Sequence, residues 1–451
     1  MSRAISTLDW RGTGAAASAI VFRHARVFDP RAGIDAAHDL VVRDGRVAEL
    51  ASAGSAGLDD AEVVDAEGLL AVPAFFDPHV HLRTPGREDK EDIETGSRAA
   101  AAGGYCGIIG MANTEPPVDT PAQVESLRER AQTDATVPVG FVATLTRAMR
   151  GNELTDMAEL GDAGAVGFSD DGLPVRSARV MRRALQYQAL AGLQIALHEE
   201  DPELSGTGVM HEGEAAAVLG MAGIPSVSES TIIARDCALA DFEGARIHVQ
   251  HLSARESVEI VEAAKALGVQ VTCEATPHHL TLTDQAVRSL DSRFKMNPPL
   301  RSEDDRQALI AAVRSGVIDT IATDHAPHTL EDKEVPFEEA AMGVTGLETA
   351  FSVLYTDLVL SGILDLPTVI ERLSAGAAAF DFDLPSLRPD AEANVALIDL
   401  DEEWEAGAEG WESRSENSCF AGRRLKGRSL MTIVAGQVAF RQRSFAMGVA
   451  P

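Results

Sequence analysis

Two histidines, His79 and His81, stand at the end of an apolar run with one residue between them. If that run forms a β-strand, its side chains alternate between the two faces, so both imidazoles point to the same side. Imidazole nitrogens are common zinc ligands, and two of them on one face can hold one ion. Histidines spaced in this way also occur at sheet ends without a metal. The pair therefore suggests a metal site without proving one.

Other possible ligands follow further apolar runs of the chain. They are Asp170 and Asp171 in GFSDDG, His198 in ALHEE, His251 in HVQHL, and Asp324 in ATDHAPH. Each alone has a simple alternative, since aspartate and histidine at strand ends often cap helices or face solvent. Capping is a poor explanation for candidates at the ends of five separate runs. Four imidazoles and two carboxylates suit zinc, and they suffice to hold two ions with one carboxylate shared.

The order of apolar runs and helical stretches predicts how these residues are brought together. Between residues 73 and 384 a short apolar run is repeatedly followed by a helical stretch, which often ends in glycine. Eight such runs predict an α/β fold, a (β/α)8 TIM-type barrel, whose active site lies at the C-terminal ends of the strands. A doubly wound open sheet is the competing fold, but the chain lacks its glycine-rich phosphate-binding motif. The predicted strands are LLAVPAFFDPHVHL, YCGIIGMAN, VPVGFVATL, AVGFSDD, LQIALHEE, ARIHVQHL, VQVTCEA and DTIATDHA.

The two ends of the chain have a different pattern. Residues 18–72 and 385–451 contain short apolar runs separated by polar, glycine-containing stretches. This pattern predicts a small β-sandwich subdomain built from both chain ends. Residues 1–17 show little pattern and are expected to form a loose tail.

Composition limits the partners. The chain has 451 residues, of which 45% are apolar and 24% charged, as in globular proteins. Its formal charge of −31 argues against nucleic acid or an anionic membrane as a partner. No run approaches the roughly 20 apolar residues that span a bilayer, and no cleavable leader is visible, so a cytoplasmic location is expected. The four cysteines lie far apart without a C-x-x-C pair, which predicts neither a thiolate zinc site nor disulfides.

The stretch from Phe75 to Thr120 carries the most specific motifs. It contains HVHLR-x-PG, KEDI-x-TG, AAAAGG and M-x-NT-x-P-x-x-DT in this order. In these motifs the chain resembles the cyclic amidohydrolases, and among them the dihydroorotases of the shorter, bacterial class I type. The resemblance implies the reversible, zinc-dependent cyclisation of N-carbamoyl-L-aspartate to L-dihydroorotate in de novo pyrimidine (UMP) synthesis. It also implies a β subdomain assembled from both ends of the chain.

The same resemblance implies a centre of two zinc ions. It assigns His79, His81 and Asp324 to one ion, His198 and His251 to the other, and Asp171 with a hydroxide as the bridge between them. Related amidohydrolases use a carbamylated lysine as the bridge, but no lysine occurs between Lys90 and Lys265. Strand alternation places Asp170 on the opposite face from Asp171, in agreement with this assignment. Because parity is fragile at the end of a strand, Asp170 stays an alternative.

Catalytic and substrate-binding roles follow from the resemblance as well. Asp324 would take the proton of the hydroxide and pass it to the leaving ring nitrogen. Arg83 would meet the substrate carboxylate with its planar guanidinium. The full set of expected substrate contacts is His81, Arg83, Asn113, Asn297, His328, Met342 and Gly343.

Some positions depart from the family pattern. The family commonly has glutamate, proline and an aromatic residue where this chain has Thr84, Ala112 and Met342. None of the three is an expected ligand. His248, three residues before His251, is expected to face away from the site and to be structural. His278 and His279 are expected to pack or to support the site.

Two other functions stay open at this point. One alternative function is that of a cyclic amidase of hydantoinase, dihydropyrimidinase or allantoinase type. Relatives of hydantoinase typically need the carbamylated lysine, which is missing here. In a substrate without a carboxylate, Arg83 and Asn113 would also have no obvious partner. The other is a non-catalytic dihydroorotase-like partner of aspartate carbamoyltransferase, whose expected mark is lost ligands, and this chain has all six. The family makes a homo-oligomer an expectation, and association with aspartate carbamoyltransferase a further one.

Overall fold

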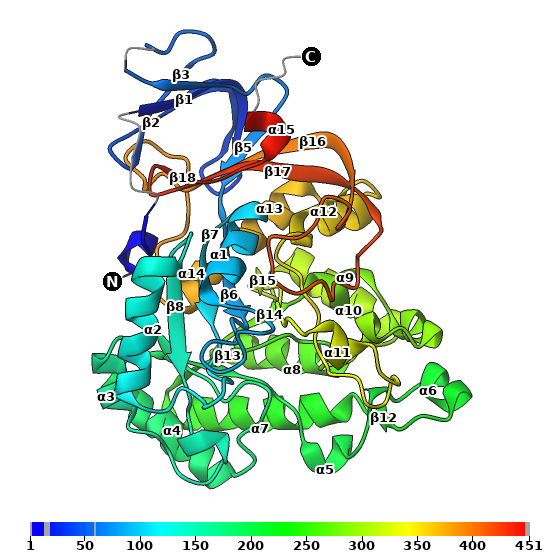
Figure 1. Cartoon of the computed structure of the whole chain (residues 1–451). Coiled ribbons are helices and arrows are strands. Elements are labelled where there is room, and N and C mark those ends of the chain that lie inside the picture. The colour runs from blue at the N-terminus through cyan, green and yellow to red at the C-terminus, as the bar shows by residue number, and fades with distance from the viewer. Residues whose placement is uncertain (1, 13–18, 58–59, 447–451) are drawn as a thin grey trace.

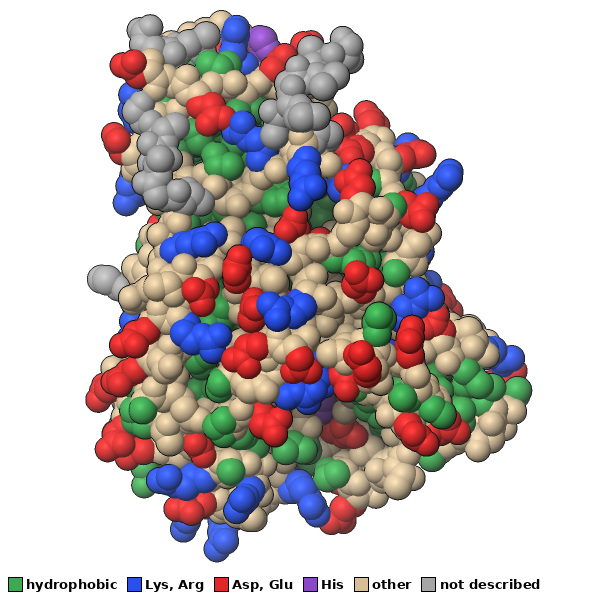
Figure 2. All heavy atoms as spheres, viewed as in Figure 1, with side chains coloured by type: hydrophobic (Ala, Val, Ile, Leu, Met, Phe, Trp, Pro, Cys, Tyr) green, Lys and Arg blue, Asp and Glu red, His purple; other side chains and the backbone are tan. Residues whose placement is uncertain are grey.

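The computed structural model describes residues 2–12, 19–57 and 60–446. A β-rich part made of strands from the beginning and the end of the chain lies at the top of Figure 1, and a ring of parallel strands with helices around it lies below. Acidic and basic side chains are interspersed on the face seen in Figure 2. The excess of acidic residues therefore forms no single patch on that face.

Eight parallel strands form the barrel, arranged in the order in which they occur along the chain. They are β6 (Phe75–Val80), β7 (Tyr105–Gly110), β8 (Val139–Ala143), β9 (Gly167–Phe168), β10 (Gln194–Leu197), β13 (Arg246–Val249), β14 (Gln270–Ala275) and β15 (Thr320–Ile321). The ring closes just beyond β15, where Val80 pairs with His325 and the N–H of His81 donates to the carbonyl of His325 at 2.8 Å. Each strand lies in one of the eight predicted runs, so the predicted (β/α)8 fold is confirmed.

Helices cover the outside of the barrel (Figure 1). The longer ones are α1 (Ile93–Ala102), α2 (Pro121–Asp134), α3 (Met157–Asp162), α4 (Ala178–Ala191), α7 (Val227–Glu243), α8 (Arg255–Ala266), α10 (Glu303–Ser315) and α13 (Leu366–Ser374). In α4, the Ser177 side chain caps the first turn by accepting from the N–H of Val180, and Gly192 ends the helix with a φ of 68°. Its buried residues recur at helical spacing and join the apolar cluster of the barrel.

Shorter elements lengthen the connections that follow several strands. After β8 comes η2 (Arg147–Met149), and after β10 come α5 (Pro202–Ser205), β11 (Met210–His211), α6 (Glu214–Leu219) and β12 (Gly223–Ile224). After β14 come α9 (Pro277–Thr281), η3 (Asp284–Ser289) and η4 (Ser292–Phe294), and after β15 come α11 (Leu330–Lys333), α12 (Ala350–Leu354), η5 (Tyr355–Val359) and, beyond α13, α14 (Gly376–Ala379). Connections that follow barrel strands surround the C-terminal ends of those strands, where the candidate ligands lie.

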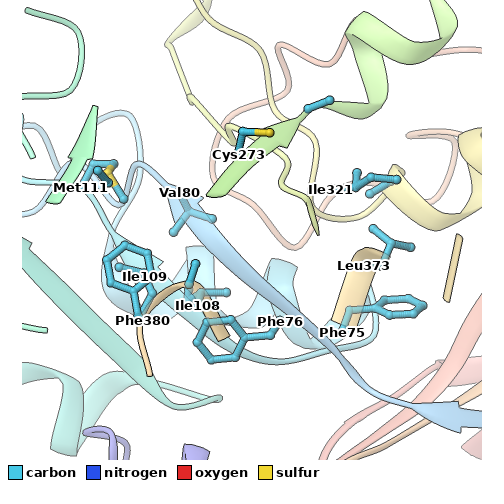
Figure 3. Close-up of a cluster of buried hydrophobic side chains, with 14 of the residues drawn as sticks. Phe75, Phe76, Val80, Ile108, Ile109, Met111, Cys273, Ile321, Leu373 and Phe380 are labelled. Carbon is cyan, nitrogen blue, oxygen red and sulfur yellow. The ribbon is translucent and has the colours of Figure 1, made fainter. Parts of the chain in front are cut away.

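The barrel strands are apolar because the sheet is covered on both faces. Figure 3 shows Phe76 and Val80 of β6 together with Ile108 of β7 in one buried cluster. Leu373 and Phe380, from the end of the barrel region, join the same cluster. Burial of these side chains stabilises the ring that holds the strand ends in place.

Strands from both ends of the chain form a second sheet, in the order β18-β17-β16-β5-β1-β2-β3, with β4 paired to β1. Their bounds are β1 (Ala19–Asp29), β2 (Ile34–Arg43), β3 (Arg46–Ser52), β4 (Glu62–Asp65), β5 (Leu70–Pro73), β16 (Val395–Glu405), β17 (Arg424–Val434) and β18 (Gln437–Arg441), followed by α15 (Arg443–Ala446). Leu40 of β2 and Met431 of β17 share one apolar cluster although their strands are far apart in this order, so the sheet folds around its own core. The prediction of a β subdomain from both chain ends is confirmed.

The expected loose tail is wrong for the part that the structure describes. Residues 2–12 include a short turn, η1 (Ile5–Thr7), and Ile5 is only 1% exposed within the barrel cluster. Asp9 pairs with β8 and accepts a hydrogen bond from Arg128 Nε at 2.6 Å. Single apolar and charged contacts of this kind leave no periodic pattern in the sequence. The rest of the predicted tail, residues 1 and 13–17, lies outside the described residues.

Candidate active site

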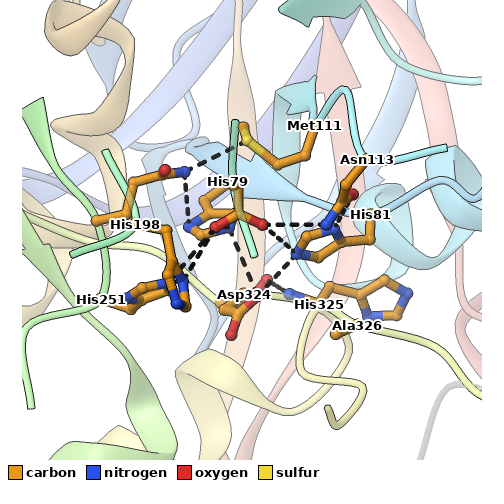
Figure 4. A network of polar contacts seen from close by, with 12 residues as sticks. His79, His81, Met111, Asn113, His198, His251, Asp324, His325 and Ala326 are labelled. Carbon is orange, nitrogen blue, oxygen red and sulfur yellow. Dashed lines mark hydrogen bonds and ion pairs between the residues drawn. The ribbon is translucent and has the colours of Figure 1, made fainter. Parts of the chain in front are cut away.

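The six predicted ligands meet at the C-terminal ends of the barrel strands. Figure 4 shows His79, His81, His198, His251 and Asp324 pointing toward a common centre. Two groups of potential ligand atoms result, in each of which all atoms lie within 4.8 Å of one another. One group is His79, His81 and Asp171, and the other is Asp171, His198 and His251. Every member is buried.

Asp171 is the residue common to both groups. Its Oδ1 lies 3.6 Å from His79 Nε2, 3.5 Å from His198 Nδ1 and 3.5 Å from His251 Nε2. Its Oδ2 lies 3.4 Å from His81 Nε2. A single carboxylate therefore faces four imidazole nitrogens that come from three different strand ends.

Asp324 lies beside His79 and His81, at the end of β6. Its Oδ1 is 3.0 Å from His81 Nε2 and 3.5 Å from His79 Nε2. Burial raises the pKa of the Asp324 carboxyl, but the charge of His79 and the hydrogen bond with His81 outweigh burial and hold the pKa well below its ordinary value. Asp324 is therefore an ionised carboxylate at neutral pH, able to act as a metal ligand.

The polar atoms at the centre fit a bound cation. His79 Nε2 and Asp171 Oδ1 are buried and have no hydrogen-bond partner. Buried polar atoms without partners are rare and costly, and they call for a bound group that satisfies them. His198 Nδ1 and His251 Nε2 also face each other at 2.9 Å. Nitrogen and carboxylate oxygen donors in this arrangement suit a divalent metal of the zinc type.

The electrostatic field of the site also favours positive charge. Burial opposes the charged form of His198, but Asp171 and Glu200 outweigh burial and raise its pKa to about 10. The Glu200 Oε2 atom lies 3.3 Å from His198 Nε2, on the side away from Asp171. The carboxylates that favour a proton on this imidazole favour a metal ion in its place equally well.

Glu274, at the end of β14, is a functional residue that the sequence pattern did not reveal. It is fully buried, and its Oε1 lies 2.6 Å from His79 Nδ1 and accepts from the N–H of His251 at 3.2 Å. Its Oε2 lies 3.0 Å from His248 Nε2, so His248, which was expected to be structural, contacts the residue that holds His79. A glutamate inside an apolar strand was the available signal, because such residues are seldom buried unless paired. Glu274 orients His79 so that Nε2 faces the centre.

Substitution of Glu274 by glutamine tests this orienting role. We expect the affinity for zinc to fall by about 10- to 100-fold, because a neutral glutamine amide holds His79 less firmly than the carboxylate does and the substitution removes a negative charge near the site. Competition with a chromophoric chelator measures that affinity independently of turnover. Glu259→Gln, on the exposed surface of α8, is the matched control. Equal zinc affinities in Glu274→Gln and wild type would remove Glu274 from the metal site.

Asp170 is turned away from the centre and does not approach the histidines. Its Oδ1 accepts from the N–H groups of Leu145 at 2.7 Å and Thr146 at 3.0 Å. Burial raises its pKa to about 6. Among the described residues, Asp171 and not Asp170 therefore supplies the carboxylate between the two histidine groups.

A second cluster, beside the first, contains Arg83 and His328. Arg83 Nη2 lies 3.4 Å from His328 Nε2, and Arg83 Nε donates to the carbonyl of Pro327 at 3.2 Å. Burial lowers the pKa of Arg83 to about 10, so the guanidinium remains charged at neutral pH. Burial and the nearby charges of Arg83 and Lys90 lower the pKa of His328 to about 2, so its imidazole is neutral. The pair can bind a carboxylate by charge and by hydrogen bonds.

The other predicted substrate contacts border the same space. Asn113 Oδ1 lies 2.9 Å from His81 Nδ1, and its Nδ2 donates to Asp171 Oδ2 at 3.3 Å. Asn297 lies on the opposite side, where its Nδ2 donates to Glu200 Oε2 at 2.7 Å. Glu200 in turn contacts His198, so Asn297 is linked to this candidate metal ligand through Glu200.

Met342 and Gly343 complete the wall beside His328. The Met342 carbonyl oxygen lies 2.9 Å from His328 Nε2, so this contact is independent of the side chain that departs from the family pattern. A Cβ on Gly343 would lie 2.8 Å from the Ala326 Cβ and 3.0 Å from His328 Nε2, and the φ of Gly343 is +136°. Only glycine allows this close approach.

His278 and His279 stay outside the ligand groups, as expected. His279 Nε2 lies 3.0 Å from the carbonyl oxygen of Pro298, and its Nδ1 lies 2.8 Å from Thr276 Oγ1. Burial lowers the pKa of both imidazoles. Both are buried and follow the end of β14, close to the site but outside the two groups of potential ligand atoms.

A (β/α)8 barrel with histidine and aspartate ligands at its strand ends, joined to a β subdomain from both chain ends, defines a metal-dependent hydrolase of cyclic amides, of the amidohydrolase superfamily. The structure is similar to L-hydantoinase (dihydropyrimidinase) from Arthrobacter aurescens, with a TM-score of 0.83 and 26% identity over 94% of this chain and 96% of that one. Dihydropyrimidinase from Brevibacillus agri NCHU1002 has the same fold, with a TM-score of 0.81 and 21% identity over 94% and 95% of the two chains.

Sequence comparison narrows this class. A family model described as dihydro-orotase-like matches residues 68–257. The chain is 44% identical to the dihydroorotase of Geobacter sp. (strain M21) over 94% of its own length and 99% of that protein. It is 45% identical to the dihydroorotase of Anaeromyxobacter dehalogenans (strain 2CP-C) over 92% and 96% of the two chains. The chain therefore belongs to the dihydroorotase family.

The described residues contain no helix with the length and apolar character needed to span a membrane.

Proposed function

We propose that this protein is a class I dihydroorotase, which interconverts N-carbamoyl-L-aspartate and L-dihydroorotate in pyrimidine synthesis. The observation that carries this proposal is the buried Asp171 carboxylate among four imidazoles, beside a cationic Arg83. No lysine lies between Lys90 and Lys265 to take the place of Asp171. The relatives named dihydroorotase cover nearly the whole chain and support the same conclusion.

We further propose that the site holds two zinc ions. His79, His81 and Asp324 would hold one, His198 and His251 the other, and Asp171 both. The support for this division is that Asp171 belongs to both groups of potential ligand atoms, and that Asp324 lies on the His81 side. When bound, the ions would polarise the scissile amide carbonyl and make a water molecule nucleophilic at neutral pH.

The other proposed roles, proton transfer and substrate binding, belong to side chains of this protein. Asp324, ionised and 3.0 Å from His81, is the group that would accept the proton of the attacking water and deliver it to the ring nitrogen. Arg83, His328 and Asn113 would bind the substrate carboxylate. Asn297 would contact the ring, and His81, Met342 and Gly343 would line the space around it. The buried setting strengthens each of these polar interactions.

Positive charge near Arg83 is local, since the chain as a whole carries a charge of −31. Lys90 Nζ lies 3.3 Å from His328 Nδ1 and adds a second cation to the cluster, although it also pairs with Asp332 at 2.7 Å. An anionic substrate is therefore drawn by short-range interactions at this point. A neutral hydantoin ring would gain nothing from them, which favours dihydroorotate.

The test combines metal analysis with a substrate panel. We expect about two zinc ions per chain, turnover of dihydroorotate, and little turnover of hydantoin or allantoin. Removal of metal with a chelator should abolish activity, and zinc should restore it. Preferred turnover of hydantoin would indicate the alternative cyclic amidase, and a metal-loaded but inert protein would indicate a non-catalytic partner of aspartate carbamoyltransferase.

Other expectations stay predictions. They are the homo-oligomer, association with aspartate carbamoyltransferase, a cytoplasmic location, and subdomain limits at residues 72–73 and 384–385.

A further inference from the structure

The connection between β16 and β17, residues 406–423, leaves the terminal sheet and packs on the barrel near Arg83 and His328. We name it the C-terminal loop. Its Ser415 Oγ donates to the carbonyl of Lys90 at 2.6 Å, and its Ser413 Oγ donates to Glu91. The C-terminal loop therefore contacts the segment that follows Arg83.

Asn417 of the C-terminal loop makes the closest connection to the proposed substrate wall. Its Oδ1 accepts from the N–H of His328 at 3.1 Å. Its Nδ2 donates to the carbonyls of Ala326 at 3.2 Å and Gly343 at 3.1 Å. The residue is only 4% exposed. One amide side chain thus joins the backbones of the two segments that carry His328 and Gly343.

These two segments have few other bonds between them. β15 ends at Ile321, before either segment, so no regular strand sets their spacing. The N–H of Ala326 donates to the Val344 carbonyl at 2.8 Å, the N–H of Gly346 donates to His325 Nδ1 at 3.2 Å, and His328 Nε2 lies 2.9 Å from the Met342 carbonyl. Without Asn417, one N–H and two carbonyls that are buried would lose a partner, and the segments would shift to satisfy them.

The proposed metal ligands are anchored in a different way. Thr323 and Asp77 hold the end of β15 just before Asp324, through Asp77 Oδ2 at 2.6 Å from Thr323 Oγ1. Glu274 holds His79, and Asn113 holds His81. A shift of the wall at His328 would therefore leave the centre in place.

We propose that Asn417 is a positioning residue for substrate binding, through which the terminal subdomain sets the distance between His328 and Gly343. This inference rests on the proposed function, because it requires that these two residues contact the substrate. It predicts a defect in substrate binding with little change in the chemical step. Misplacement of a binding group by about 1 Å is enough for a large kinetic effect.

The test is the kinetics of Asn417→Ala with dihydroorotate. We expect KM to rise at least about tenfold, with kcat within about threefold of wild type and an unchanged zinc content. Asn394→Ala is the matched control, since Asn394 is a buried asparagine of the terminal subdomain that accepts from the N–H of Ala435 at 2.9 Å. The control should lower Tm and leave KM unchanged.

The outcomes separate the inference from the proposed function. Inert wild-type protein, loaded with zinc, would overturn the proposed function and this inference together. Active wild type with an unchanged KM in Asn417→Ala, or an equal loss of kcat at constant KM, would overturn the inference alone. If Asn417→Ala does not fold, Asn417→Ser, which keeps one hydrogen-bonding group, replaces it under the same criteria.

Discussion

Substitution of Asp324 by asparagine should lower kcat for dihydroorotate by about three orders of magnitude and leave most of the zinc bound. Asparagine has the same shape and keeps an oxygen that can face a cation, but it cannot accept a proton at neutral pH. The reason lies in the position of Asp324, whose Oδ1 is 3.0 Å from His81 Nε2 at the edge of the cluster. Steady-state kinetics and metal analysis of the purified variant measure the two effects separately.

A matched control for Asp324→Asn is available at the other end of the same strand. Asp319 precedes β15 and accepts a hydrogen bond from Lys265 Nζ at 2.6 Å. Asp319→Asn removes a charge from the barrel without touching the site, and its kcat should stay close to that of wild type. Near wild-type turnover in Asp324→Asn would exclude Asp324 from proton transfer. Loss of both zinc ions together with turnover would show that Asp324 acts chiefly as a ligand.

Replacement of Arg83 by methionine should raise KM for dihydroorotate by roughly 100-fold, with zinc content unchanged. Methionine preserves much of the length and apolar volume of the side chain, but it removes the charge and the planar donors that would meet the substrate carboxylate. Because Arg83 also lies against His328 and Pro327, its loss affects the carboxylate-binding cluster and leaves the metal-facing histidines untouched.

Arg87→Met is the control for Arg83→Met. Arg87 lies four residues further on, where it is partly exposed and paired with Asp89. Its substitution removes a charge of the same sign from the same connection, so a small effect there would separate specific binding from long-range attraction. A wild-type KM in Arg83→Met would place the substrate carboxylate elsewhere in the site. The same variant assayed with hydantoin should show no comparable change, since hydantoin lacks the carboxylate.

The two variants probe different halves of the mechanism. In the proposed mechanism, Asp324 acts on the bond that is cleaved or formed, whereas Arg83 selects the substrate that carries this bond. The Glu274→Gln variant tests a residue that holds the candidate metal site in position, and the Asn417→Ala variant tests one that holds the proposed substrate contacts in position.

The order of apolar runs was sufficient to predict the barrel and the convergence of the candidate ligands at one end of it. A parallel barrel brings the C-terminal ends of all its strands to one face, so residues at strand ends must converge whatever their separation along the chain. His81 and Asp324 meet in this way although 243 positions separate them. Residue type then limits the chemistry, since buried imidazoles and carboxylates together suit a metal.

Only the tertiary structure showed which residues hydrogen-bond to these candidate ligands and hold them in position. The choice between Asp170 and Asp171 depended on the exact end of β9, and it was decided by the backbone N–H groups of Leu145 and Thr146, which bind Asp170. The role of Asn417 does not follow from the pattern of its own segment, and a glutamate inside an apolar strand signals that Glu274 is paired but not with which residues. Their partners lie on other strands or in the other subdomain, and such contacts depend on the stagger of the barrel and the course of a loop. Strand alternation specifies which face a side chain occupies, but only the folded chain specifies what it meets there.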